Sequence, residues 1–164
     1  MADLAKILSL HQQWFPSSCA ASGMEMVLKL HDKQPEEWFG LQQEFQNQNI
    51  GFGRLDKLAD HGLQAQETHL TKPDFLAKVQ QECAAGRHPI FSLPNLGYTR
   101  LIDGGAGGIG EWHIWMAVLD GGKTCGVSKA FMRSSALCIP NLEQVLDRAI
   151  AFEPNYRVHV VTYQ

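Results

Sequence analysis

The sequence predicts an α+β domain, in which an N-terminal helical half packs against an antiparallel sheet formed by the second half. Apolar residues recur mainly at the helical spacing of about 3.6 residues as far as Gly86. Beyond that point short runs alternate as in β-strands, and helices followed by such strands are typical of an α+β fold. With 164 residues, 45% of them apolar and 19% charged, the chain has the size and composition of one folded domain, residues 1–164.

The expected helices have recognisable ends. Ser17 or Ser18 can act as the N-cap of the first helix, and Pro35 with two Glu residues suits the first turn of the second. Gly62 can end the third helix, and Thr71 can cap the start of the fourth. In order, we expect the helices of the first half over residues 17–30, 35–46, 53–62 and 71–87.

The expected strands have the two-residue period of a sheet. The dipeptide Gly121-Gly122 follows Asp120 between two of them and predicts a hairpin. One further amphipathic helix, over 140–152, precedes the last strand. We expect strands over residues 63–69, 88–93, 99–103, 111–120, 123–134 and 156–163.

The charge and the apolar runs exclude several classes of protein. The net charge is −3, and the 14 Lys and Arg residues are scattered, so we expect no nucleic-acid partner and no anionic membrane surface. No apolar run approaches the roughly 18 residues of a membrane span, and the N-terminus lacks the small-residue cleavage site of a signal peptide. We therefore expect a cytoplasmic protein, while secretion by a non-standard route stays open.

Four cysteines are too few for a disulfide scaffold in a chain of this length, so we expect reduced thiols. No paired C-x2-C spacing occurs, which argues against a structural zinc site. The segment GGAGGIG contains a literal G-x-G-x-x-G, but a strand rather than a helix follows it, so we expect no nucleotide cofactor. We interpret Cys125 and Cys138 as core residues of neighbouring elements, and we expect neither a metal nor an organic cofactor.

Cys19 is the candidate nucleophile. It follows a proline and two serines at the start of the first expected helix, where the helix dipole lowers the pKa of a thiol and favours the reactive thiolate. A small buried core residue is the alternative interpretation. Gln13, six residues upstream, is a candidate oxyanion donor beside the backbone N–H of the nucleophile. An exposed polar residue is the alternative for Gln13.

A cysteine nucleophile needs a base, which is usually a histidine from a distant part of the chain. His113 has the right setting, because it begins an apolar strand directly after a glycine-rich loop. His159 lies within a strand, and a packed or exposed histidine is the simpler account there. Five further histidines have polar or turn-like surroundings and are expected at the surface: His11, His31, His61, His69 and His88.

The order of these segments resembles the C39-type family of papain-like cysteine peptidases, which includes bacteriocin leader-processing enzymes. The most specific parts are QWFPSSC and the pair GRHPIF and EWHIWMAVLD, and the similarity covers nearly the whole chain in order. The resemblance implies a papain-like fold with the active site between its two halves. Carried over by position, it implies Cys19 as nucleophile, His113 as base and Gln13 as oxyanion donor.

The family orients its histidine with an Asp or Asn, and the corresponding place here holds Ser134 or Ser135. Ser134 and Asn141 are therefore the candidate orienting residues, because Asp120 belongs to the turn at the far end of the histidine strand. Trp112 and Trp14 are candidates for lining a substrate cleft, although tryptophans are often core residues.

The function expected from these residues is hydrolysis of a peptide or amide bond in a peptide or protein substrate. One alternative is an acyl transferase that uses the same Cys–His pair. The other is a peptidase-like module that binds a peptide or protein partner with weak or no catalysis. The sequence leaves the substrate and the oligomeric state open.

Overall fold

The computed structural model describes residues 6–7, 11–15, 18–34, 39–46, 54–94, 112–128, 137–139 and 142–164, and these form an α+β fold. The helices are α2 (Cys19–Leu30), α3 (Gly40–Glu44), α4 (Asp56–Ala59), α5 (Lys72–Ala84) and α7 (Leu142–Phe152). The strands are β1 (Ala65–Leu70), β2 (Ile90–Pro94), β3 (Trp112–Asp120), β4 (Lys123–Ser128), β5 (Leu137–Ile139) and β6 (Val158–Tyr163). One sheet contains all six of these strands.

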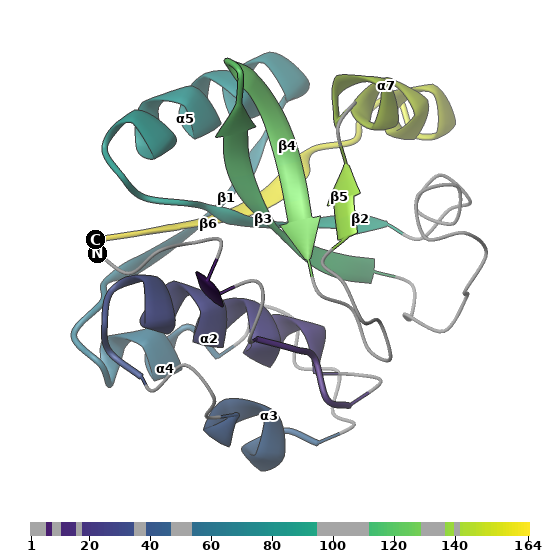
Figure 1. Cartoon of the computed structure of the whole chain (residues 1–164). Coiled ribbons are helices and arrows are strands. Elements are labelled where there is room, and N and C mark those ends of the chain that lie inside the picture. The colour runs from purple at the N-terminus through teal and green to yellow at the C-terminus, as the bar shows by residue number, and fades with distance from the viewer. Residues whose placement is uncertain are drawn as a thin grey trace.

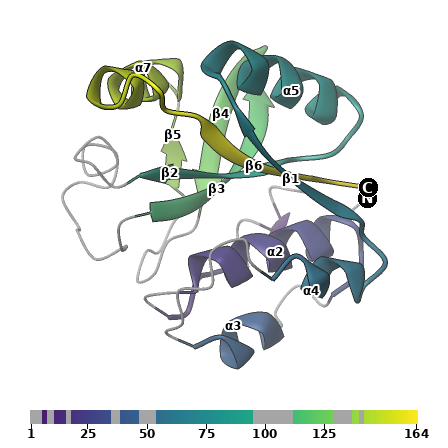
Figure 2. The ribbon, with the colours of Figure 1, turned by 180° about the vertical axis from the view of Figure 1, so that it is seen from behind.

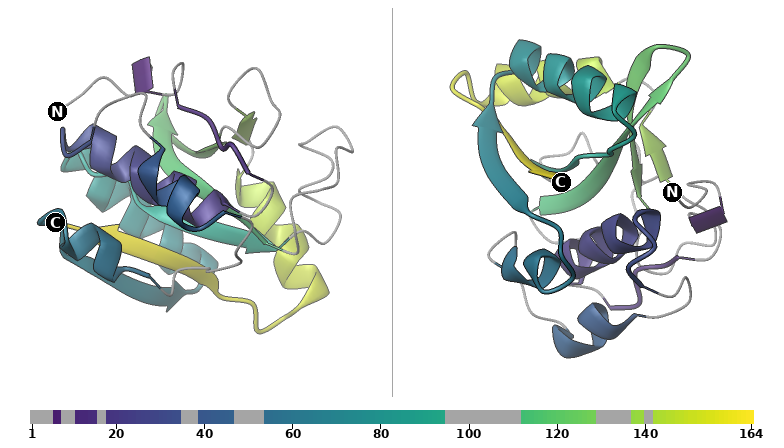
Figure 3. Two further views of the ribbon diagram at one scale, coloured as in Figure 1. Left: turned by 90° about the horizontal axis from the view of Figure 1, so that it is seen from below. Right: turned by 90° about the vertical axis from the view of Figure 1, so that its left-hand side faces the viewer.

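The sheet separates two layers of helices. Helices α2, α3 and α4 lie on one face, and α5 and α7 lie on the other, as the front and back views show (Figures 1 and 2). The strand order is β1-β6-β2-β3-β4-β5, and every neighbouring pair is antiparallel. Strand β6, the last along the chain, therefore lies between β1 and β2, so the sheet joins the two halves of the sequence. Figure 3 shows the same layers from two further directions.

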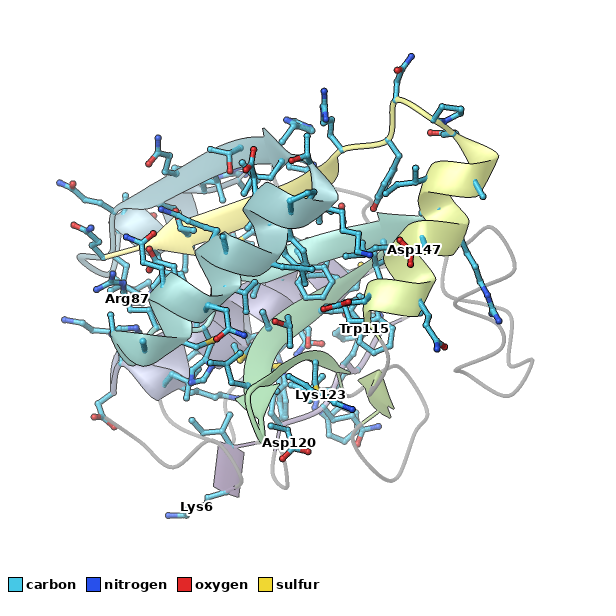
Figure 4. All side chains as sticks on the ribbon, turned by 90° about the horizontal axis from the view of Figure 1, so that it is seen from above. Lys6, Arg87, Trp115, Asp120, Lys123 and Asp147 are labelled. Atoms are coloured by element: carbon cyan, nitrogen blue, oxygen red, sulfur yellow. The ribbon has the colours of Figure 1, made fainter. Side chains whose placement is uncertain are left out.

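Strand β3 contributes to two hydrophobic cores because successive side chains point to opposite faces of a sheet. Ile114 and Met116 pack in the first core, with α2, whereas Trp115 and Ala117 pack in the second core, with α5 and α7. Figure 4, seen from the side of α5 and α7, labels Trp115 next to these helices. The two faces of β3 therefore serve different layers, and only the first-core face meets the helix that begins at Cys19.

Helix α2 is the centre of the first layer. Every residue from Ala20 to Leu30 is buried, so other parts of the chain cover this helix on all sides. Gly23 allows its close approach to the sheet, because a Cβ atom at this position would lie 3.0 Å from Cγ2 of Ile114. A larger residue at position 23 would push α2 away from β3.

Most of the expected elements are confirmed. The helix expected over 17–30 begins at Cys19, and α5 has the predicted N-cap, with Thr71 Oγ1 accepting a hydrogen bond from the N–H of Asp74 at 3.4 Å. The hairpin is confirmed as well: Gly121 and Gly122 have φ angles of 57° and 83°, as a type I′ turn requires.

Other expectations were wrong or fall outside the described residues. Ser18 occupies the N-cap position of α2, but its side chain makes no capping hydrogen bond. The helix expected over 53–62 is reduced to α4, and β5 was missed. The helix expected over 35–46 is confirmed only as the five residues of α3, with 35–38 outside the described residues. The strand expected over 99–103 lies entirely outside them.

Within the described part of the chain, no helix has both the length and the apolar character needed to cross a membrane.

We predict that Gly23→Val lowers the free energy of unfolding by about 1–3 kcal/mol, because the new side chain overpacks the contact between α2 and Ile114. Chemical denaturation measures this change. The control is Gly121→Asn, since no atom would lie within 4 Å of its Cβ and Asn tolerates a positive φ. Equal stability of Gly23→Val and wild type would show that α2 does not pack on β3 at this position.

Candidate active site

Cys19 is the first residue of α2 and is partly exposed at the edge of the first core. Three nearby backbone N–H groups, of Ile114, Ala20 and Cys19 itself, act on the sulfur to lower its pKa. Donors of this kind stabilise a thiolate. Burial nevertheless dominates and raises the pKa of the Cys19 thiol above its usual value. The N–H groups of Cys19 and Ala20 at the helix start lower the pKa, as expected, but burial outweighs them.

His113 lies on the strand that reaches the thiol. It is the second residue of β3 and directly precedes Ile114, whose backbone N–H lies near the Cys19 sulfur. Its backbone is therefore one residue from the contact between β3 and α2. The side chains of His113 and Trp112 lie outside the described residues, so the pairing of imidazole and thiol stays a prediction.

Gln13 is almost fully buried in the segment that leads to α2, so the alternative of an exposed polar residue is wrong. Its amide nitrogen donates a hydrogen bond to the carbonyl oxygen of Phe15 at 2.8 Å. An amide nitrogen carries two N–H groups, so this bond does not prevent donation to a second acceptor. The role of Gln13 as oxyanion donor stays a prediction.

Gln42 of α3, which the sequence analysis did not single out, holds this segment in place. Its Oε1 accepts a hydrogen bond from the N–H of Trp14 at 2.8 Å and lies 3.0 Å from the hydroxyl of Ser18. Its Nε2 donates to the carbonyl oxygen of Gln12 at 2.9 Å. One buried amide therefore fixes the backbone on both sides of Gln13 and the residue that directly precedes the thiol.

A buried polar stripe runs along α2, formed by Ser22, Glu25 and Lys29 at helical spacings of three and four residues. His11 covers part of it, with Nε2 at 2.7 Å from the Ser22 hydroxyl and Nδ1 at 2.8 Å from the Lys29 ammonium group. His11 is fully buried, so the expectation that it lies at the surface is wrong. The N-terminal segment is thus bonded to the middle of the helix.

Glu25 is the carboxylate of the polar stripe. Its two oxygens accept hydrogen bonds from Nε2 of Gln34 at 2.7 Å and from the backbone N–H of Gln42 at 3.2 Å. Burial raises the pKa of Glu25 to about 7, although Gln34, the nearby charge of Lys29 and Gln42 partly oppose the shift. Glu25 therefore changes its charge near neutral pH while it remains inside the protein.

Some of the remaining predicted site residues are placed by the structure, and others lie outside the described residues. Ser134 and Asn141 lie outside the described residues, so no candidate for orienting His113 is placed. Asp120 lies at the exposed hairpin end of β3, where Figure 4 labels it, and this agrees with its rejection as an orienting residue. Trp14 belongs to the segment that leads to Cys19 and is 48% exposed, and its role in lining a cleft stays a prediction.

The other three cysteines lie on other elements than Cys19. Cys83, on α5, is half-buried with a free thiol, and burial raises its pKa to about 11. Cys125 is buried in β4, and Cys138 lies on the neighbouring strand β5, which confirms that they belong to adjacent elements. The side chain of Cys138 is outside the described residues.

The imidazole of His159 lies on the first-core face of the sheet. The sequence did not show that it pairs with neighbouring side chains. His159 hydrogen-bonds Glu67 through Nε2 and stacks on His69, with ring centroids 4.2 Å apart. The sheet register pairs His159 with Ser92 and Ser92 with Ile114. Position 159 is therefore two strands, or about 10 Å, from the strand that contacts Cys19. The described residues include no group of three or more His, Cys, Asp or Glu side chains arranged to hold a metal ion.

The sequence contained only a weak signal for these additional residues. Ser22, Glu25 and Lys29 share one side of an otherwise apolar helix, and such a pattern normally indicates a face exposed to water. Nothing in the local pattern shows that His11 and Gln42 cover this side.

We predict that Glu25→Gln flattens the dependence of stability on pH. The folded protein keeps the Glu25 proton up to about pH 7, while the unfolded chain releases it near pH 4.5. The unfolded state therefore binds fewer protons in this range. The contribution of Glu25 to stability is fully present below about pH 4.5 and falls by up to about 3 kcal/mol as the pH rises to 7. Urea denaturation at several pH values measures the difference between wild type and variant.

The control for this experiment is Glu44→Gln, which changes an exposed carboxylate on α3. It should leave the pH dependence of wild type in place. If Glu25→Gln shows the same slope as wild type between pH 4.5 and 7, then Glu25 does not hold a proton in the folded protein.

We also predict that Gln42→Ala lowers the free energy of unfolding by about 1–3 kcal/mol, because it leaves buried backbone groups without their partners. Amide hydrogen exchange should accelerate at Trp14, whose N–H loses its acceptor. The neighbouring variant Gln43→Ala is the matched control, since Gln43 is exposed. Equal exchange at Trp14 in both variants would contradict the role given to Gln42.

Comparison of the chain with protein-family models, with curated proteins and with solved structures found no match. The family resemblance seen in the sequence therefore stays a proposal, and the function has to be argued from the residues themselves.

Proposed function

We propose that the protein is a papain-like cysteine hydrolase of the C39 type, which cleaves a peptide or amide bond with Cys19 as nucleophile, His113 as base and Gln13 as oxyanion donor. The observation that carries the proposal is the proximity of the Cys19 sulfur to the backbone N–H of Ile114, at the place where α2 packs closely on β3. It joins the start of the central helix to the strand position next to His113. The two residues lie 94 positions apart in the sequence, and the fold brings their backbones together.

The reaction has two stages. Cys19 transfers its proton to His113, and the thiolate attacks the carbonyl carbon of the substrate. The N–H of Cys19 and the amide of Gln13 stabilise the negative oxygen of the tetrahedral intermediate. His113 then returns the proton to the leaving amine, and water, activated by the same imidazole, hydrolyses the thioester.

The environment of the thiol makes the imidazole essential to this proposal. Burial raises the pKa of Cys19, so the helix start and the neighbouring N–H groups do not suffice to form a thiolate at neutral pH. A positively charged imidazole within about 4 Å stabilises a thiolate and lowers its pKa by several units in enzymes of this type. The proposal therefore requires His113 to supply most of the activation.

The proposal also requires the His113 side chain to lie on a particular face of the sheet. The register partner of position 113 is Leu93, which packs in the second core, on the face of the sheet away from α2. The imidazole must instead reach the face that carries Ile114. The register is continuous from Trp112 to Met116, so the proposal requires the imidazole to turn toward α2 at the start of the strand.

A second candidate function is a peptidase-like module that binds a peptide without cleaving it. The observation in its favour is the raised pKa of Cys19, because a buried thiol in its neutral form is a poor nucleophile.

We predict that iodoacetamide alkylates Cys19 much faster than Cys83 below about pH 7, and that His113→Ala removes this difference. Cys83 is the internal reference, because it is a half-buried thiol whose pKa burial raises to about 11. Mass spectrometry of the alkylated peptides between about pH 4 and 9 gives the apparent pKa of each thiol.

The matched control is His159→Ala, which removes an imidazole on the first-core face of the sheet, away from Cys19. It should leave the apparent pKa of Cys19 unchanged. If His159→Ala raises that pKa and His113→Ala does not, the base is wrongly assigned. If Cys19 in wild type titrates at or above about pH 8.5, the hydrolase proposal fails and the binding module is favoured.

A further inference from the structure

A small apolar hollow lies beside the segment that leads to Cys19. It measures about 270 Å³ and is lined by Trp14, Phe15, Phe39 and Gln43. The indole of Trp14 is 48% exposed, and it is the one large apolar side chain with this degree of exposure in the part of the chain that the structure describes. A tryptophan held open to water at the rim of a hollow is a frequent anchor for a ligand.

The walls of the hollow are fixed by contacts with the buried interior. The Trp14 ring meets the ring of Phe39 edge to face, with centroids 5.3 Å apart. Phe39 in turn has the Lys29 ammonium group 4.7 Å from its ring centroid, and Gln42 holds the backbone of Trp14. A ligand therefore meets a surface whose side chains already have their positions, so little conformational entropy is lost on binding.

The hollow is also tied closely to the thiol. The N–H of Phe15 donates to the hydroxyl of Ser18 at 3.3 Å, and the N–H of Ser18 donates to the carbonyl oxygen of Phe15 at 3.3 Å. Ser18 directly precedes Cys19. Even a fully extended chain would place the Cα atoms of Phe15 and Cys19 no more than about 14 Å apart, and these hydrogen bonds shorten the path.

The volume and the lining residues of the hollow indicate which chemical group it can bind. An engineered cavity of about 150 Å³ encloses benzene, and pockets for drug-sized molecules begin near about 300 Å³. A hollow of 270 Å³ therefore suits one large side chain. Of the four lining residues in the described part of the chain, three are aromatic and none is charged, so an aromatic or branched aliphatic group fits against them.

We propose that this hollow is the specificity pocket of the protein and binds one aromatic or branched aliphatic side chain of a peptide, within about four residues of the bond that Cys19 attacks. The description of the hollow as a specificity pocket rests on the proposed hydrolase function. Binding of the side chain is independent of that function, since it requires only the hollow.

The test uses a library of acetylated octapeptides in which each position in turn carries Phe, Leu, Ala or Asp in a background of Gly and Ser. Wild type should cleave peptides with Phe or Leu at one particular position at least about tenfold faster, in kcat/KM, than those with Ala or Asp there. Trp14→Ala should lower the values for Phe and Leu to the value for Ala. The control Gln46→Ala, at an exposed position outside the hollow, should keep the wild-type preference.

Binding of the same peptides, labelled with a fluorophore, to Cys19→Ala separates the two proposals. If wild type cleaves no peptide, but Cys19→Ala binds the Phe and Leu peptides and Trp14→Ala does not, the hollow is a binding site and the hydrolase proposal fails. If cleavage occurs with no side-chain preference, or if Trp14→Ala slows all peptides equally, the hydrolase proposal stands and the pocket is overturned. If the peptides are neither cleaved nor bound, both are overturned.

Discussion

Every residue of α2 from Ala20 to Leu30 is buried, so the polar side chains of this helix must find their partners inside the protein. His11, Gln34 and Gln42 supply them, and each belongs to a different segment that wraps around the helix. Hydrogen bonds to the polar side chains of α2 therefore hold three other parts in place: the N-terminal segment, α3 and the turn after α2. Removing one of these partners leaves a buried polar group of α2 without a hydrogen bond. The fold then loses the full desolvation free energy of that group.

The same helix sets the geometry of the candidate site. Gly23 lets its first turns lie directly on Ile114, and Cys19, one turn earlier, reaches the backbone of the same strand. Gln42 then connects α3 to the residues before the thiol. The chemistry proposed for Cys19, Gln13 and the hollow at Trp14 thus depends on contacts that also stabilise the fold. Substitutions there have to be checked for stability before any loss of activity is interpreted.

Local signals in the sequence predicted the elements whose structure is decided locally. The Gly121-Gly122 hairpin, the cap at Thr71 and the apolar runs of β3 and β6 are of this kind. The short strand β5 was missed, because its three residues form a strand only through pairing with β4. The polar stripe of α2 looked like an exposed face, since only the tertiary structure brings His11 and Gln42 over it. The helix start lowers the pKa of Cys19 as the local pattern predicted, but desolvation by the fold, which no local pattern shows, outweighs it.

The proposed mechanism requires the imidazole of His113 to meet the thiol of Cys19 on the face of the sheet that carries α2. A crystal structure of the protein would give the distance between the Cys19 sulfur and the nearer ring nitrogen of His113. We expect a hydrogen-bonding distance of about 3.5 Å. An imidazole packed with Leu93 and Trp115 on the opposite face of the sheet would contradict it, and Cys19 would then have no base on β3.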